Sequence, residues 1–193
     1  MTPRCRDIII GSLLGDGCLE RNGKNVRLRI DHGPDQQSFV GWKFQQLLEL
    51  KPSVPKRIEY YDRRTGKTYV HFRFTTKTTR ELNPFLELFY GNGRKIVPST
   101  IKSLLNSALG VAVWYMDDGG RRSDCCAGYL NTQSFHKDEV HLLRDCLSEN
   151  FGLATATHFA AGRPRIYLGA KTFPKFCGIV RSYVIPDLQY KLL

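Results

Sequence analysis

The chain lacks any apolar run long enough to cross a membrane. Its longest runs fall well short of the about 18–20 consecutive apolar residues that a transmembrane helix needs. Near the N-terminus, Arg4 and Arg6 precede an apolar triplet, but glycine and polar residues follow within a few positions, which argues against a secretory signal. Low-complexity tracts are missing as well. We therefore expect a soluble, intracellular protein without a membrane partner.

Cysteines at metal-binding or disulfide spacing are also missing. The six cysteines form no CxxC pair, and none has a nearby histidine at the spacing of a zinc site. A chain of 193 residues can bury a full hydrophobic core, so it does not need a disulfide framework. We expect six reduced thiols, without structural zinc.

Acidic residues are scarce relative to basic ones. The chain has 18 Asp and Glu against 29 Lys and Arg, a formal net charge of +11. The excess is concentrated in residues 1–105, with a net charge of +9, whereas residues 106–193 carry only +2. This imbalance favours a polyanionic partner such as nucleic acid, and a basic surface kept only for solubility is the alternative.

One order of elements is written twice along the chain. In the first half, apolar periodicity predicts helices over residues 5–15, 36–50 and 79–89, and strands over residues 26–32, 56–62 and 67–75. In the second half it predicts helices over residues 106–118, 137–150 and 171–184, and strands over residues 126–133, 154–160 and 165–169. We therefore expect an α+β fold made of a duplicated αββαββα unit, with halves 1–105 and 106–193 related by a pseudo-two-fold axis.

The first helix of each half ends in an acid followed by glycine, at Asp16 and Asp118. Gly11 and Gly15 share one face of the first helix and allow close packing. We expect Ala108 and Ala112 to form the matching face of the second, with Gly110 off that face. Both carboxylates then emerge together, and hard oxygen ligands of this kind suit Mg²⁺ held against a phosphate. Such a site is suited to phosphodiester hydrolysis, with a nearby lysine stabilising charge in the transition state.

Polar residues on one face of the predicted strands form a candidate DNA-binding surface. Arginine suits guanine, and asparagine or glutamine suits adenine, in a major groove wide enough for β-ribbons. In the first half the candidates are Arg27, Arg29, Asp31, Tyr69, His71, Arg73 and Thr75, with Arg63, Arg64 and Lys67 at a hairpin tip placed for phosphate contacts. In the second half they are Tyr129, Asn131, Gln133, Arg163, Arg165 and Tyr167.

The two acid-tipped segments, Ile8–Gly17 and Leu109–Gly120, resemble the motif of the LAGLIDADG homing endonucleases in its two-motif, single-chain form. The resemblance covers nearly the whole chain. It implies two saddle-shaped antiparallel sheets over a long DNA site and Mg²⁺-dependent cleavage of both strands, leaving short 3′ overhangs. Mn²⁺ or Ca²⁺ is expected to replace Mg²⁺ in binding. By this resemblance, the expected roles are metal-binding acids for Asp16 and Asp118, active-site lysines for Lys95 and Lys191, and main-chain metal ligands for Gly15 and Asp117.

The resemblance leaves two main functions open, and a DNA-binding regulator on an inactive nuclease scaffold is a weaker third, because such a protein has no need of paired acids. The first is a site-specific, double-strand DNA endonuclease that promotes intron or intein mobility. The second is an intron maturase on the same scaffold, whose partner is intron RNA. Retention of both acids and both lysines favours the endonuclease. In either case we expect a monomer, because one chain supplies both halves, and an organelle as the usual compartment of such introns.

Overall fold

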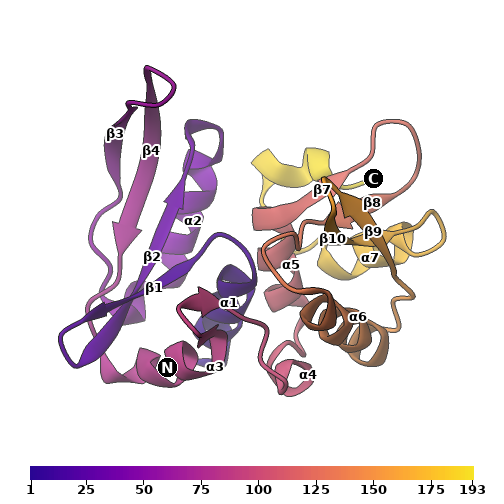
Figure 1. The fold of residues 1–193 in the computed structure, drawn as a ribbon, viewed down its shortest axis with the longest axis horizontal. Helices are drawn as coiled ribbons and strands as arrows, with labels where there is room; N and C mark the ends of the chain where they lie inside the picture. The colour runs from indigo at the N-terminus through magenta and orange to yellow at the C-terminus, as the bar shows by residue number, and fades with distance from the viewer.

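The computed structural model describes residues 1–193 and divides them into two halves of the same architecture (Figure 1). The first half comprises α1 (Pro3–Leu14), β1 (Cys18–Asn22), β2 (Asn25–His32), α2 (Gln37–Gln46), β3 (Lys56–Asp62), β4 (Lys67–Thr75) and α3 (Asn83–Phe89). A short link follows, with β5 (Tyr90–Gly91), β6 (Arg94–Lys95) and α4 (Ile101–Leu104). The second half comprises α5 (Ala108–Asp118), β7 (Gly119–Arg121), β8 (Gly128–Leu130), α6 (Lys137–Phe151), β9 (Ala156–Ala160), β10 (Arg163–Leu168) and α7 (Phe173–Val180).

Each half contains one antiparallel sheet of four strands, and the two sheets have equivalent orders. The first sheet runs β1-β2-β4-β3 and the second β7-β8-β10-β9. This repetition confirms the expected α+β class and the duplicated αββαββα unit. Helices α1 and α5 lie side by side where the two halves meet (Figure 1). The packing of these two helices therefore sets how one sheet stands relative to the other.

Local sequence explains where most elements begin and end. Strand β2 alternates strictly between buried and half-buried residues, as its period-two pattern predicted. The β3–β4 hairpin has the predicted bounds, with Gly66 at φ +66° in its turn. Thr2 and Ser107 cap the N-termini of α1 and α5 by accepting hydrogen bonds from backbone amides. Pro84 and Pro174 stand in the first turns of α3 and α7, where no amide donor is needed.

One hydrophobic core joins the two halves. It is a continuous cluster of 45 buried residues, to which α1 contributes Ile8, Ile9 and Ile10 and α5 contributes Val113 and Trp114. Both central helices are buried almost all round, which explains their apolar composition. All six cysteines are free, as expected. None of the helices is both long and apolar enough to span a bilayer.

Several sequence-based bounds were wrong. Strands β1 and β7 were not located, and the strand expected over residues 126–133 forms only over Gly128–Leu130. The helix expected over 36–50 breaks after Gln46 and continues as a 3₁₀ turn at Leu48–Leu50. The β9–β10 turn uses only two residues, both with positive φ, so Arg163 and the residue after it belong to the strand. The last helix, expected over residues 171–184, forms only over Phe173–Val180.

Candidate active site and nucleic-acid interface

The contact between α1 and α5 is built on glycine. A Cβ placed on Gly11 would lie far inside van der Waals contact of the carbonyl oxygen of Gly110, and 2.8 Å from the Cβ of Val113. The expectation that Ala108 and Ala112 face α1 with Gly110 off the face is therefore wrong. The contact face of α5 runs instead through Gly110, Val113 and Asp117, at helical spacing. Backbone contact at this level brings the C-terminal ends of the two helices close together.

Asp16 and Asp118 line the same cleft at these helix ends. The cleft has a volume of about 380 Å³ and is also lined by Gly15, Lys95 and Asn131, among residues without a single hydrophobic side chain. Burial, and then the negative charges of Asp16 and Asp117, raise the pKa of Asp118 to about 7. Two carboxylates at the negative ends of two helices repel each other, so this arrangement favours a bound cation.

A lysine from each half reaches the helix ends. The Lys95 ammonium donates hydrogen bonds to the carbonyl oxygens of Gly15, at 2.6 Å, and Gly17, at 2.7 Å. Lys191, in the 3₁₀ turn Pro186–Lys191, donates to the carbonyl oxygen of Met116 at 2.7 Å. Burial lowers the pKa of both lysines, while the nearby aspartates oppose this shift. The two lysines predicted from the resemblance therefore each contact main-chain carbonyls at the end of the central helix of their own half.

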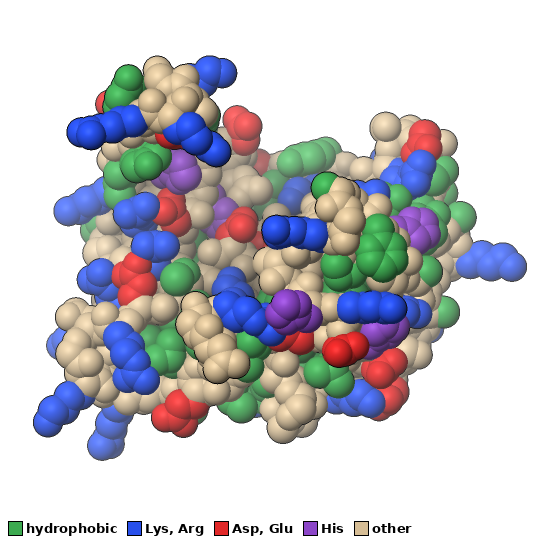
Figure 2. All heavy atoms as spheres, viewed as in Figure 1, with side chains coloured by type: hydrophobic (Ala, Val, Ile, Leu, Met, Phe, Trp, Pro, Cys, Tyr) green, Lys and Arg blue, Asp and Glu red, His purple; other side chains and the backbone are tan.

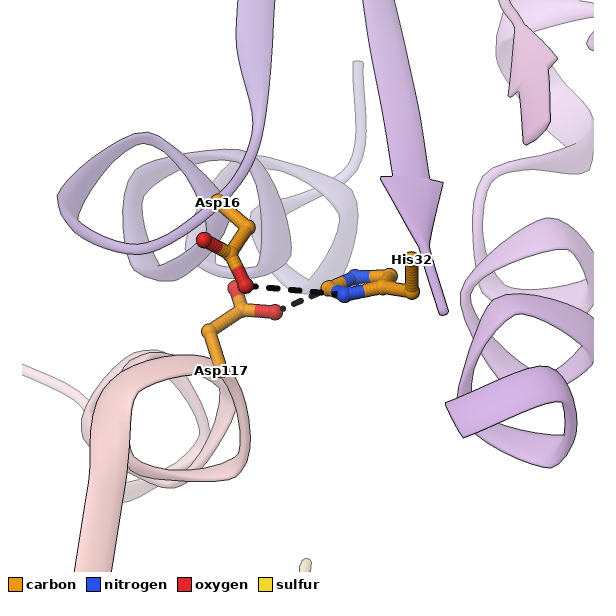
Figure 3. Close-up of side chains that lie close together, drawn as sticks. All are labelled: Asp16, His32 and Asp117. Carbon is orange, nitrogen blue, oxygen red and sulfur yellow. Dashed lines mark ion pairs between the residues drawn. The ribbon is translucent and has the colours of Figure 1, made fainter. Parts of the chain in front are cut away.

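The Asp117 side chain is not at the surface but buried between the halves. Lys43, on α2, donates to its Oδ1 at 2.7 Å and its Oδ2 at 2.8 Å, and neither side chain is exposed. His32, at the end of β2, faces both carboxylates from one side, with Nε2 3.3 Å from Asp117 Oδ1 and Nδ1 3.5 Å from Asp16 Oδ2 (Figure 3). Burial, and then the Lys43 charge, lower the pKa of His32 to about 3, so the ring is neutral.

Sequence reasoning missed Lys43 and His32. Lys43 stands on the apolar face of α2, in line with the buried Phe39, Val40 and Leu47, and this position is the one signal that a charge is buried there. His32 ends the strict alternation of β2 on its buried side. A buried lysine requires an acid as its partner, and that acid is 74 residues away in the sequence.

The donor set of the cleft fits a hard divalent cation. The carboxylates of Asp16 and Asp118 and the neighbouring main-chain carbonyls are oxygen donors of the kind that Mg²⁺ takes, and the cleft leaves room for water and phosphate. The three residues Asp16, His32 and Asp117 are also close enough to share an ion. However, both oxygens of Asp117 already accept from Lys43, which makes this second grouping a poorer cation site.

The first sheet carries paired arginines on the face predicted to be polar. Arg27 and Arg29 both form ion pairs with the carboxylate of Glu20 on β1. The sequence analysis did not predict these pairs, because it did not locate β1. Asp31 accepts from Arg73 Nε at 2.8 Å and lies 3.0 Å from His71 Nδ1. Strand register confirms that these residues share one face, since Arg29 pairs with Thr75 and Asp31 with Arg73. Tyr69 continues this face toward the exposed tip formed by Arg63, Arg64 and Lys67.

In the second sheet the candidate side chains Tyr129, Arg165 and Tyr167 contact one another on one face. Tyr129 is only 9% exposed, because the Arg165 guanidinium lies 3.5 Å above its ring and Arg122 donates to its hydroxyl group. Tyr167 stacks on His158 with 4.1 Å between ring centroids. Asn131 and Gln133 lie beyond the end of β8 and line the acidic cleft, and Arg163 is exposed at the hairpin turn.

Basic side chains gather over the first half in the space-filling view. Figure 2 shows Lys and Arg on the β3–β4 hairpin and along the first half, and a hollow at the top of the view between the two halves. This distribution follows the sequence, in which the first half carries most of the positive charge. A strongly basic sheet next to a cleft with two acids suits a polyanion whose phosphates approach a cation.

A model of the LAGLIDADG DNA endonuclease family matches residues 6–176. The chain belongs to this family. It is 26% identical over 194 residues to a probable intron-encoded endonuclease 1 of Wickerhamomyces canadensis, covering 97% of this chain and 83% of that protein. It is 26% identical over 193 residues to the cytochrome b mRNA maturase bI2 of Debaryomyces hansenii, covering 96% of this chain and 72% of that protein. Among solved structures, the homing endonuclease I-WcaI bound to its DNA recognition sequence matches with a TM-score of 0.91 and 25% identity, over 100% of this chain and 87% of that one.

Proposed function

We propose that this LAGLIDADG protein is a single-chain homing endonuclease that cuts both strands of a long DNA site by Mg²⁺-dependent hydrolysis. The observation that carries the proposal is the placement of Asp16 and Asp118 in one cleft, each with a lysine beside it. Support also comes from the likeness to a homing endonuclease bound to its DNA recognition sequence. We infer that the chain acts as a monomer with halves 1–105 and 106–193, leaves short 3′ overhangs, and promotes mobility of an organellar intron.

The acids and lysines at the two helix ends have distinct roles in this reaction. Asp16 and Asp118 would hold the cation together with the main-chain carbonyls of Gly15 and Asp117. When bound, the cation neutralises the scissile phosphate and lowers the pKa of a water molecule. Lys95 and Lys191 keep positive charge beside the helix ends, where it stabilises the negative charge that develops on the phosphate. Their lowered pKa values also favour exchange of a proton with water.

The test begins with selection of cleaved sites from a randomised DNA pool in the presence of Mg²⁺. The selected site is placed in a supercoiled plasmid, and nicking and linearisation are followed over time. Asp16→Asn and Asp118→Asn are each expected to lower the cleavage rate at least 1000-fold, because the metal contributes several kcal/mol to the barrier. Affinity for the site in Ca²⁺ should stay within about threefold. Robust cleavage by the double variant would contradict the assignment of the acids.

Arg73 provides a test of the DNA-binding face. Arg73→Ala is expected to weaken binding to the selected site by about 1–3 kcal/mol and to relax the preference for one base. Arg57→Ala is the matched control, because Arg57 pairs with Phe72 in the strand register and therefore lies on the opposite face of the sheet. Affinities are measured by fluorescence anisotropy against all single-base variants of the site. Unchanged affinity and base preference would remove Arg73 from the interface.

The second candidate function is an RNA-binding maturase. It is favoured by one observation, the likeness over nearly the whole chain to a cytochrome b mRNA maturase. The same basic sheets would then contact intron RNA, and the acids would have no required role. Splicing of the host intron by wild type and by the Asp16→Asn/Asp118→Asn variant separates the two functions. Splicing that depends on the protein but not on the acids, without DNA cleavage by the wild type, would favour the maturase.

A further inference from the structure

The buried pair of Lys43 and Asp117 crosses from one half of the molecule to the other. Lys43 belongs to the first half and Asp117 to the end of the central helix of the second half. Both side chains are completely buried, and the ammonium group contacts both carboxylate oxygens. Burying two charges costs several kcal/mol per ion, and a well-packed apolar pair of the same shape is often as stable. Stability alone therefore does not account for this pair.

The pair has no counterpart at the pseudo-two-fold-related positions. Strand register fixes the equivalence, since Cys18 pairs with Arg29 in one half and Gly120 with Tyr129 in the other. Continuing this register, and the matching buried faces of α2 and α6, the equivalents of Asp117, Lys43 and His32 are Gly15, Leu143 and Thr132. The polar network is therefore built on one side only, and all three of its members differ from their counterparts.

The network fixes the end of α5 next to the acid of the second motif. The Asp117 carboxylate fills the space beside Gly15, where an added Cβ would lie 2.6 Å from Asp117 Oδ2. The two hydrogen bonds from Lys43 tie the last turn of α5 to α2 of the opposite half. Asp118, the next residue, lines the cleft. His32, only 4% exposed, packs against both the Asp117 and the Asp16 carboxylates (Figure 3).

We propose that Lys43 is a positioning residue, which holds Asp117 from the opposite half and thereby sets the distance and direction between Asp118 and Asp16. This inference rests on the proposed nuclease function and adds a residue that does not itself touch the reacting groups. It explains why a buried charge pair is placed at the one layer of the helix interface that adjoins the cleft. At the end of α1, Gly15 packs directly against the Asp117 side chain, so the same carboxylate contacts both helix ends.

The test is a double replacement that keeps shape and removes charge, Lys43→Met with Asp117→Leu. A purely structural pair replaced in this way should leave every property near wild type. We expect the urea midpoint and the DNA affinity in Ca²⁺ to stay near wild type. The first-order cleavage rate at saturating Mg²⁺ should fall at least tenfold. The Mn²⁺ dissociation constant, measured by electron paramagnetic resonance on the protein alone, should rise at least fivefold. The control is Lys102→Met/Glu149→Leu, which removes an exposed lysine–glutamate ion pair in the same way.

A folded double variant with wild-type cleavage and wild-type Mn²⁺ affinity would overturn the inference. If the double variant does not fold, Asp117→Asn, which keeps the shape of the side chain, takes its place in the same measurements. Wild-type cleavage and Mn²⁺ affinity in a folded Asp117→Asn protein would overturn the inference equally. Failure of the proposed function gives a different result, because the wild-type protein then cleaves no selected site while the Mn²⁺ titrations still compare the variants.

Discussion

Gly11→Ala is expected to lower the free energy of unfolding by about 1–3 kcal/mol, although alanine is the better helix former. The added methyl group would meet the Gly110 carbonyl oxygen far inside van der Waals contact and approach Trp114 N at 3.1 Å. These are backbone atoms of the facing helix, which no side-chain rotation can move aside. The two central helices must therefore separate or shift, and the acids at their ends shift with them. We expect the cleavage rate of Gly11→Ala to fall at least tenfold even under conditions where the protein remains folded.

Gly41→Ala is the matched control for this prediction. Gly41 also lies within a helix, α2, but a Cβ placed there meets no atom within 4 Å. The substitution should therefore stabilise the protein by up to about 1 kcal/mol through helix propensity alone. Urea unfolding of both variants, with cleavage of the selected site, gives the comparison. Equal stability of the two variants would show that α1 and α5 do not approach as closely as described.

Short-range patterns predicted much of the fold. The β3–β4 hairpin was placed at its observed bounds because two alternating strands flank a glycine turn, and both features are local. By contrast β1 reads Cys-Leu-Glu-Arg-Asn, without clear alternation, and β7 has only three residues. Such strands form because a neighbouring strand offers hydrogen bonds, and this information is tertiary. The choice of contact face on α5 is also tertiary information, because packing against α1 decides that Gly110 faces it and the alanines do not.

Local sequence patterns also predicted only part of the candidate site. Asp16 and Asp118 follow from two acid-glycine helix ends, and their meeting in one cleft agrees with the duplicated sequence. Lys95 and Lys191 came only from the family resemblance, since neither has a local pattern that predicts its contact with a helix end. Lys43 lies within the predicted amphipathic helix over residues 36–50, and the sequence analysis did not single it out. Its burial depends on a carboxylate from the other half, and pairing over this separation is invisible to periodicity.

Asp118→Asn is expected to make the protein inactive and also more stable. Burial and the charges of Asp16 and Asp117 raise the pKa of Asp118 to about 7 in the folded state, above the value of about 3.9 for an unfolded chain. The folded state therefore binds a proton more readily than the unfolded state between about pH 4 and pH 7. Stability falls as the pH rises through this window, and the whole cost is present above pH 7. Asparagine carries no charge at any pH, so it removes this cost.

In buffer with EDTA at pH 8, Asp118→Asn should raise the free energy of unfolding by about 1–3 kcal/mol, and the gain should vanish near pH 4. Urea unfolding at several pH values measures both effects. Asp145→Asn, at an exposed position on α6, is the control for the loss of a carboxylate. Lower stability of Asp118→Asn at pH 8 would contradict the raised pKa. A carboxylate that serves to bind a cation lowers the stability of the metal-free protein, whereas a carboxylate that serves the fold raises it. A gain in stability together with a loss of cleavage in Asp118→Asn therefore identifies Asp118 as a cation ligand.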